Sequence, residues 1–220
     1  MSNRDRELTR TLAADLLRIG AVALRPNEPF TWASGRKAPV YCDNRLTLSY
    51  PDVRMQITEG FVANTKAFFN GEVDVVAGTA TAGIPQAALL AEHMRLPMAY
   101  VRGKAKGHGK ENRIEGRIEP GQRVVVVEDL VSTGGSSLSA AEAIRDAEAE
   151  PIAVLSIFTY GFEVAQNAFD EAGIQSISLT DFDTLIGMAV ETGALTDDEV
   201  LILLNWRADA AAWSRVHGGA

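Results

Sequence analysis

The chain has 220 residues, 46% of them hydrophobic, which is enough for one buried core with at most a small appendage. Its net charge of −8 at pH 7 argues against a nucleic-acid-binding surface, which would carry a basic stripe. The apolar runs fall short of the ~18 residues that cross a bilayer, and the polar N-terminus does not resemble a secretory signal. The single cysteine, Cys42, excludes an internal disulfide. We therefore expect one cytoplasmic domain over residues 1–220, with no nucleic-acid or membrane partner.

The N-terminal part is expected to form a helix followed by a small hood. Apolar residues recur at helical spacing over Arg4–Ala23. Short extended runs and a Ser34-Gly35 turn then predict a hairpin-like hood over residues 26–48. One interpretation is an edge hairpin with a basic turn, and the other is a cover over a substrate. The stretches SGRKAP and YCDNR are unusual in plain turns, which favours the cover.

Strands and helices alternate through the rest of the chain. Helices are expected over residues 51–69, 84–94, 137–150, 163–171, 181–191 and 197–216. Strands are expected over residues 73–77, 96–101, 124–127, 152–158 and 174–179. Strands recurring every ~25 residues with helices between them are typical of right-handed βαβ units. The fold class expected is therefore α/β, a parallel sheet flanked by helices.

The loop Gly78–Gly83 joins the first of these strands to its helix through small residues. It is neither a Walker loop, because no Lys-Ser/Thr follows its last glycine, nor a GxGxxG dinucleotide turn. Two interpretations remain open for it. The small residues either allow tight strand–helix packing or form an edge that contacts an anion.

Residues 102–116 form a segment without apolar periodicity that concentrates positive charge among four glycines. Its cationic residues are Arg102, Lys104, Lys106, His108, Lys110 and Arg113. A solvated loop is the plain interpretation of such a charge run. A mobile, glycine-hinged cationic loop would also suit closure over a diphosphate, where it would exclude water and add positive charge.

The stretch from Arg123 to Ser137 carries the clearest signal. Four valines predict a strand buried on both faces. Glu128 and Asp129 follow it directly, then a Ser/Gly loop and the start of a helix. Free backbone amides at a helix N-terminus bind phosphate, and carboxylates accept hydrogen bonds from sugar hydroxyls or face a metal. A ribose 5-phosphate meets both demands, whereas the plain alternative is a buried strand with a solvated end.

Residues 125–137 resemble the phosphoribosyl-diphosphate (PRPP) motif of the type I phosphoribosyltransferases. The hood and the 102–116 segment resemble those of orotate phosphoribosyltransferases. The resemblance implies that Glu128 and Asp129 hold the ribose hydroxyls, and that Lys106, His108 and Asp129 are catalytic. It implies that Ser132 also reaches orotate. The PRPP-binding residues that it implies are Arg102, Lys106, His108, Glu128, Asp129, Leu130, Val131, Ser132, Thr133, Gly134, Gly135 and Ser136.

The reaction implied is that of a pentosyltransferase, a glycosyltransferase that moves ribose 5-phosphate from PRPP to orotate. The products are orotidine 5′-monophosphate and diphosphate, in pyrimidine (UMP) biosynthesis. Mg²⁺ is the implied cofactor, held mainly through PRPP with no direct protein ligand, and the implied assembly is a homodimer with shared active sites. Two alternatives are a phosphoribosyltransferase for another base and a non-enzymatic PRPP sensor.

Three positions depart from one pattern within that family. Many bacterial members have a lysine at the position of Ala33 and a Tyr-Lys pair at Thr81-Ala82. They also have an arginine that contacts the base near the position of Tyr160. A subgroup that shares YCDNR and KGHGK lacks those residues too, so we interpret the departure as a subgroup difference. Trp206 and Trp213 are seven residues apart on one expected helix, which predicts a shared core or dimer face.

Overall fold

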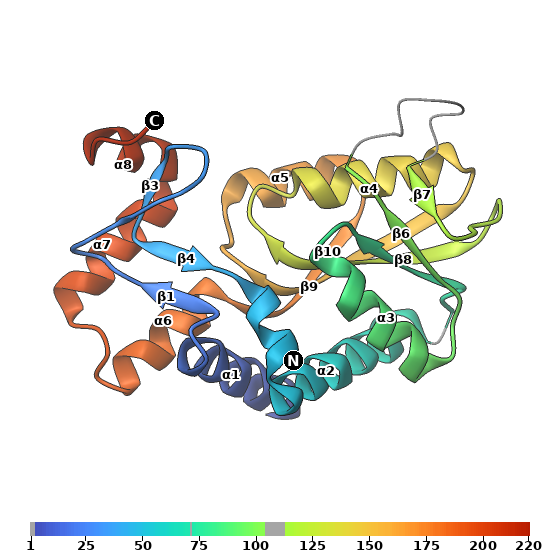
Figure 1. The fold of residues 1–220 in the computed structure, drawn as a ribbon, viewed down its shortest axis with the longest axis horizontal. Helices are drawn as coiled ribbons and strands as arrows, with labels where there is room; N and C mark the ends of the chain where they lie inside the picture. The colour runs from blue at the N-terminus through green and yellow to red at the C-terminus, as the bar shows by residue number, and fades with distance from the viewer. Residues whose placement is uncertain (1–2, 71, 104–112) are drawn as a thin grey trace.

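The computed structural model describes residues 3–70, 72–103 and 113–220, and its centre is a six-stranded sheet in the order β10-β9-β8-β5-β6-β7 (Figure 1). All neighbouring strands pair in parallel apart from the short β7, which is antiparallel to β6. The strands are β5 (Val75–Thr79), β6 (Met98–Val101), β7 (Ile114–Glu115), β8 (Arg123–Val131), β9 (Glu150–Thr159) and β10 (Gln175–Asp181). The expected parallel α/β fold is confirmed.

Helices cover both faces of the sheet, which explains the continuous valine runs in its strands. The helices are α1 (Asn3–Arg18), α2 (Pro51–Phe69), α3 (Gly83–Met94), α4 (Gly135–Asp146), α5 (Glu163–Ala172) and α6 (Phe182–Glu191). Side chains alternate along a strand, so Val125 and Val127 of β8 join the core that includes α1, α2 and α3. Val124 and Val126 join the second core, with α4 and α5 on the opposite face (Figure 1). Among the described residues, no helix is long and apolar enough to cross a membrane.

Helix α1 is shorter than the sequence predicts. It ends at Arg18, and Gly20 then adopts a left-handed φ of 73° that turns the chain out of the helix. The next residues form strand β1 (Val22–Leu24), which pairs with β4 (Val40–Cys42). The expectation of a helix as far as Ala23 was therefore wrong, because a distant strand takes up these backbone groups.

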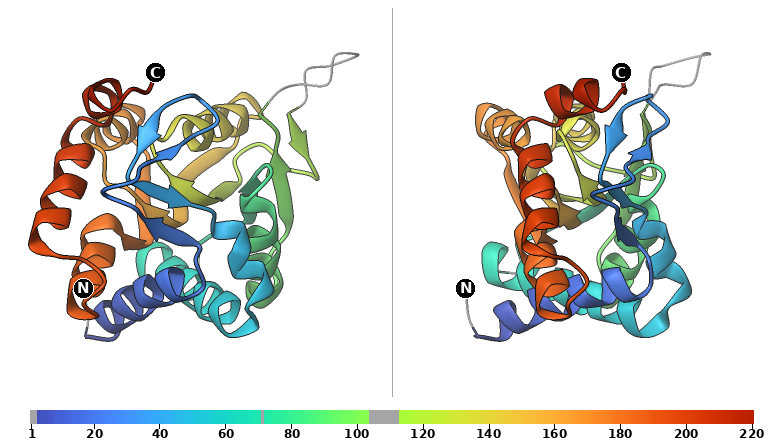
Figure 2. Two further views of the ribbon diagram at one scale, coloured as in Figure 1. Left: turned by 60° about the vertical axis from the view of Figure 1, so that its left-hand side comes forward. Right: turned by 90° about the vertical axis from the view of Figure 1, so that its left-hand side faces the viewer.

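The hood contains strands from the N-terminal part of the chain and is backed by its last two helices (Figure 2). Besides β1 and β4 it contains β2 (Phe30–Thr31) paired with β3 (Lys37–Ala38), and the 3₁₀ helix η1 (Asn44–Ser49). The chain ends in α7 (Asp197–Ala208) and α8 (Ala210–Val216), where a single helix was expected. Asp209 breaks it, because its carboxylate accepts a 2.8 Å hydrogen bond from Ala212 N and caps α8.

The break separates the two tryptophans that were expected to share a face. Trp206 on α7 is fully buried and packs edge-on against Trp32 of the hood, with ring centroids 6.1 Å apart. Trp213 lies on α8 and stacks on His217 at 3.6 Å. The expectation of one shared helix face was therefore wrong, although both Trp206 and Trp213 belong to the core.

Ser214 of α8 joins the C-terminal segment to the hood. Its buried hydroxyl accepts a 2.9 Å hydrogen bond from Lys37 N and donates one of 2.9 Å to Ala220 O. Ala220 N in turn donates to Gly35 O at 3.1 Å. The β2–β3 turn that carries the SGRK sequence is thus held by hydrogen bonds to residues from the C-terminal end of the chain.

Candidate active site

The centre of the sheet contains a change of direction in its topology. From β5 the chain passes through α3 to β6, whereas from the neighbouring β8 it passes through α4 to β9 on the opposite face. A crevice forms outside the carboxyl ends of parallel strands at such a point, and ligands bind there. The loop after β5, residues 80–82, and the loop after β8, residues 132–134, flank this crevice.

Strand β8 continues beyond the point where the valine run predicts its end. It stays paired with β9 as far as Val131, and Glu128 lies opposite Ser156 in the register. The two acids were expected to follow the strand, but they lie within it because the ten-residue β9 provides partners that far. Strand geometry therefore fixes the backbone of both acids.

Glu128 is a buried carboxyl with its own hydroxyl donors. Its side chain is 5% exposed, and Oε2 accepts from Ser136 Oγ at 3.3 Å and Ser137 Oγ at 3.4 Å. Its Oε1 accepts from Asp129 N at 3.1 Å. Burial first, and the adjoining Asp129 second, raise the pKa of Glu128 to about 8. Glu128 is therefore largely protonated at neutral pH.

Asp129 is half-buried beside it, and burial raises the pKa of its carboxyl above the ordinary value. Hydrogen bonds from Glu128 and the backbone, together with the charge of Arg45, oppose that shift. One neutral and one more readily ionised carboxyl can both donate to and accept from vicinal hydroxyls. The pair therefore suits a sugar diol.

The loop after β8 turns sharply into helix α4. Gly134 has a φ of 80°, and a Cβ at this position would lie 3.0 Å from Phe169 Cε2, so both the backbone and the packing favour glycine. The first helical hydrogen bond joins Leu138 N to Gly134 O at 2.9 Å. The amides of the preceding turn, residues 135–137, thus have no acceptor within the helix. Together with the helix dipole they form an anion-binding site.

The loop after β5 lies against the strand that carries the acids. A Cβ on Gly83 would overlap the Val127 carbonyl oxygen, so only glycine allows this approach. Ala80 N donates to Val101 O at 2.9 Å, and the Ala80–Thr81 peptide bond is cis. Of the two interpretations of this loop, tight packing is therefore directly observed. Contact with an anion stays a prediction.

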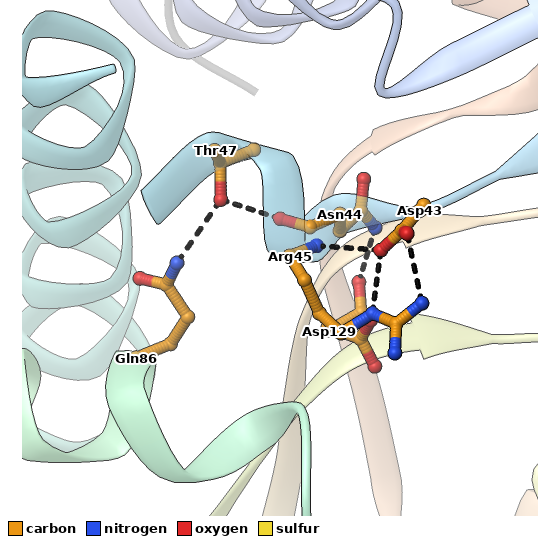
Figure 3. A network of polar contacts seen from close by, with 6 residues as sticks. All are labelled: Asp43, Asn44, Arg45, Thr47, Gln86 and Asp129. Atoms are coloured by element: carbon orange, nitrogen blue, oxygen red, sulfur yellow. Dashed lines mark hydrogen bonds and ion pairs between the residues drawn. The ribbon is translucent and has the colours of Figure 1, made fainter. Parts of the chain in front are cut away.

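A polar network that the sequence did not reveal joins the hood to this crevice (Figure 3). Asn44 in η1 is 1% exposed, and its Nδ2 donates to the Asp129 carbonyl oxygen at 2.7 Å. Thr47 Oγ1 donates to Asn44 O at 2.6 Å and accepts from Gln86 Nε2 of α3 at 3.3 Å. The YCDNR run was noted as unusual, but its partners are distant in the sequence.

Arg102 follows β6 at the same edge of the sheet. Its Nε lies 3.2 Å from Glu115 Oε1, and its amide donates to Arg113 O at 2.9 Å. Arg113 donates back to Arg102 O at 2.9 Å and to Ser139 Oγ of α4 at 3.0 Å. Both ends of the cationic segment are thus joined close to α4. Lys106 and His108 lie outside the described residues.

A cavity of about 580 Å³ adjoins the loop after β8. Ser132 and Thr133 line it on one side, and Trp32, Phe162 and Trp206 contribute an aromatic wall. Neither acid belongs to its lining. Tyr160 also lies in this aromatic cluster, 5.3 Å from Trp206 by ring centroids, and burial raises its pKa. Tyr160 is therefore a core aromatic next to this cavity.

The acid pair, the amide-rich turn and the topology define a phosphoribosyltransferase domain. A model of the phosphoribosyl transferase domain family matches residues 54–182, more than half of the chain. Among solved structures, orotate phosphoribosyltransferase from Aeropyrum pernix has a TM-score of 0.72 at 30% identity, and the match covers 84% of this chain and 99% of that one. The Mycobacterium tuberculosis enzyme in complex with PRPP has a TM-score of 0.63 at 25% identity over 81% of this chain and 98% of that one.

Sequence similarity narrows the class further. The orotate phosphoribosyltransferase of Bacillus caldolyticus is 52% identical over 202 residues, which span 92% of this chain and 97% of that protein. The chain therefore belongs to the orotate phosphoribosyltransferase family.

Proposed function

We propose that this protein transfers the ribose 5-phosphate group of PRPP to orotate, giving orotidine 5′-monophosphate and diphosphate. The observation that carries the proposal is the position of Glu128 and Asp129 on β8, directly before the amide-rich start of α4 at the topological switch point. Support comes from relatives named orotate phosphoribosyltransferase and from the M. tuberculosis enzyme that binds PRPP. This places the reaction in pyrimidine biosynthesis.

In the proposed reaction the C1–O bond to diphosphate breaks and a C1–N bond to orotate forms, with positive charge developing on the ribose. The N–H bond of the reacting orotate nitrogen also breaks, and its proton passes to the departing diphosphate. The amides of residues 132–136 hold the 5′-phosphate, and the acid pair accepts hydrogen bonds from the 2′- and 3′-hydroxyls. These contacts fix the ribose from two sides. The protein's contribution is then mainly orientation and electrostatic stabilisation.

We propose that Lys106, His108 and Arg102 neutralise the charge that develops on the diphosphate leaving group. This rests on the family pattern, with Arg102 placed at the carboxyl end of β6. We further propose that the segment reaches across a homodimer, so that each subunit lends its cations to its partner's site. We also propose, from the resemblance to the family, that Ser132 contacts orotate. Ser132 lies in the lining of the aromatic cavity.

Mg²⁺ belongs to the proposal as a charge-neutralising clamp on the diphosphate. Among the described residues, no three His, Cys, Asp or Glu side chains gather in a way that could hold a metal ion. The acid pair offers carboxylate oxygens at the crevice, and we propose that the ion takes most of its ligands from PRPP. A cytoplasmic location completes the proposal, based on the single unpaired cysteine, Cys42.

A turnover assay tests the proposed function. Purified protein, PRPP and Mg²⁺ are incubated separately with orotate, uracil, adenine and hypoxanthine, and the nucleotide product is quantified. We expect turnover with orotate at least 100-fold above the other bases, and its loss with chelator. Turnover with another base would indicate a different phosphoribosyltransferase, and PRPP binding without turnover would indicate a sensor.

A further inference from the structure

Arg45 has a guanidinium group that is held in place yet remains open to the crevice (Figure 3). Its Nε donates to Asp43 Oδ1 at 2.6 Å and its Nη2 donates to Asp43 Oδ2 at 2.8 Å. The Arg45 side chain is nevertheless 64% exposed, against 21% for Asp43. An exposed arginine is ordinarily free to sample many rotamers, so this two-point attachment orients the group.

The orientation is reinforced from the backbone. The Asp43 carboxylate also accepts from Arg45 N at 3.2 Å, capping η1 at the residue that carries the guanidinium. The same arginine lowers the pKa of Asp43, which keeps that carboxylate ionised at neutral pH. Two of the five guanidinium N–H groups are used by Asp43, which leaves three directed elsewhere.

The Arg45 side chain lies within range of the charge of Asp129. The preceding residue, Asn44, is bonded to the main chain of Asp129 at 2.7 Å, so residue 45 cannot move away from that strand. Figure 3 shows the Arg45 guanidinium next to the Asp129 side chain. Burial raises the pKa of the Asp129 carboxyl, and the charge of Arg45 opposes that rise. In the described part of the chain, Arg45 has an ion pair with Asp43 alone.

We propose that Arg45 binds the diphosphate group of PRPP, an inference that rests on the proposed function. The acid pair would hold the 2′- and 3′-hydroxyls, and the start of α4 would hold the 5′-phosphate. The remaining anion of PRPP is the diphosphate on C1, next to the 2′-hydroxyl. Arg45 belongs to η1, whose Asn44 is bonded to the main chain of Asp129, and not to the α4 loop that would hold the 5′-phosphate. We therefore assign this cation to the diphosphate. The N–H groups of Nη1 and Nη2 that Asp43 leaves unused form a second, end-on pair of donors that can match two phosphoryl oxygens.

The test compares Arg45→Gln and Arg45→Lys with a matched control, Arg18→Gln. Arg18 likewise donates through Nε and Nη2 to one aspartate, Asp15, at 2.9 and 2.8 Å, with a further 3.4 Å contact from Nη2 to Asp52 Oδ2, and its side chain is 54% exposed. It lies on α1, away from the crevice. Affinities for inorganic diphosphate and for PRPP are measured by calorimetry, and the KM values for PRPP and orotate by steady-state kinetics.

We expect Arg45→Gln to weaken diphosphate and PRPP binding about 10- to 100-fold, the range for loss of a charge-assisted hydrogen bond. Arg45→Lys should recover part of that loss because it restores charge without the fork. The KM for orotate should stay within about twofold, and Arg18→Gln should match the wild type.

Unchanged diphosphate affinity in both Arg45 variants would overturn the proposal. A rise confined to the KM for orotate would overturn it too, since the arginine would then serve the carboxylate of the base. Failure of the Arg45 proposal can be distinguished from failure of the proposed function. If the wild type binds diphosphate but does not turn over orotate, the proposed function fails while the Arg45 comparison still stands.

Discussion

The side-chain amide of Asn44 donates a 2.7 Å hydrogen bond to the main-chain carbonyl oxygen of Asp129, 85 residues away in the sequence. Asn44 is 1% exposed, and in the described structure its Oδ1 has no hydrogen-bond partner. One buried donor thus connects the hood to the strand that carries the acid pair. This bond holds η1 of the hood against β8, together with the contact between Thr47 and Gln86.

Replacing Asn44 by alanine should therefore affect both stability and activity. The Asp129 carbonyl oxygen would lose a buried donor, which costs about 1–3 kcal/mol, and kcat/KM for PRPP should fall at least tenfold as the hood loses its attachment. Urea unfolding and steady-state kinetics measure the two effects. Asn27→Ala is the control. It removes an exposed 2.9 Å hydrogen bond from the Asn27 side-chain amide to Glu199, and it should change neither the stability nor kcat/KM. Wild-type kinetics for Asn44→Ala would contradict the inferred role.

Asp129→Asn should lower kcat/KM for PRPP by about 100-fold or more without loss of stability. Burial raises the pKa of Asp129, so the folded protein disfavours its ionised form, and an uncharged amide avoids that cost. Kinetics and the melting temperature are measured on the same preparation. A variant that melts earlier, or one with unchanged kinetics, would show that the carboxylate serves the fold and not the substrate.

Glu128 should make stability fall as pH rises through the neutral range. Its folded pKa of about 8 lies above the ordinary value of 4.5, so between these limits the folded state binds more protons than the unfolded chain. The slope from this group is at most about 1.4 kcal/mol per pH unit. Urea unfolding at pH 5.5, 6.5 and 7.5, without ligands, should show this slope in the wild type and its loss in Glu128→Gln. Parallel slopes in the two proteins would disprove the shift.

Gly134→Ala separates backbone strain from steric overlap. A Cβ there meets Phe169 at 3.0 Å and also forces alanine into a φ of 80°. Gly173→Ala is a matched control, since its φ is 63° but no atom lies within 4 Å of the added Cβ. Both variants should lose about 1 kcal/mol from the backbone, but only Gly134→Ala should lose more and raise the KM for PRPP several-fold. Equal losses with equal kinetics would mean that the overlap has no effect on the turn.

Subunit exchange tests the proposed sharing of sites. Lys106→Ala damages the segment that a subunit lends, whereas Asp129→Ala damages the crevice that it owns. In a mixed two-fold dimer one site carries both defects and the other carries neither. Random 1:1 exchange gives about half mixed dimers, so roughly a quarter of the sites should recover orotate turnover. No recovery after demonstrated exchange would assign Lys106 to its own subunit's site.

Local sequence was sufficient to predict those helices and strands whose start and end signals lie within or next to them. Helix α2 has the predicted bounds of Pro51 and Phe69, because a proline at its start and the left-handed Asn70 at its end are both local signals. The run from Val124 to Gly134 likewise predicts a buried strand, an acid pair and a loop in that order, although the strand continues to Val131. Lys106 and His108, outside the described residues, remain predictions.

Long-range choices were not available from the sequence. The short strand β1 follows Gly20 closely enough to resemble a helix end, and its pairing with β4 decides otherwise. The alanine-rich stretch around Asp209 has high helix propensity, yet the aspartate caps a new helix and redirects the chain toward the hood. Asn44 could not be paired with Asp129 for the same reason, since their contact depends on the completed fold.

The hood is built from both ends of the chain, so the order of synthesis on the ribosome affects when it can form. Lys37 and Ser214 are separated by 177 residues. The strands of the hood are therefore synthesised early, and the helices α7 and α8 that support them are synthesised last. At a synthesis rate of ~5–20 residues per second, the gap is roughly 10–35 s. The sheet and its acid pair can assemble within that interval, while Trp32 still lacks Trp206. A nascent chain halted before α7 should therefore resist protease in its sheet but be cleaved in its hood. The finished enzyme appears only when the last helix docks.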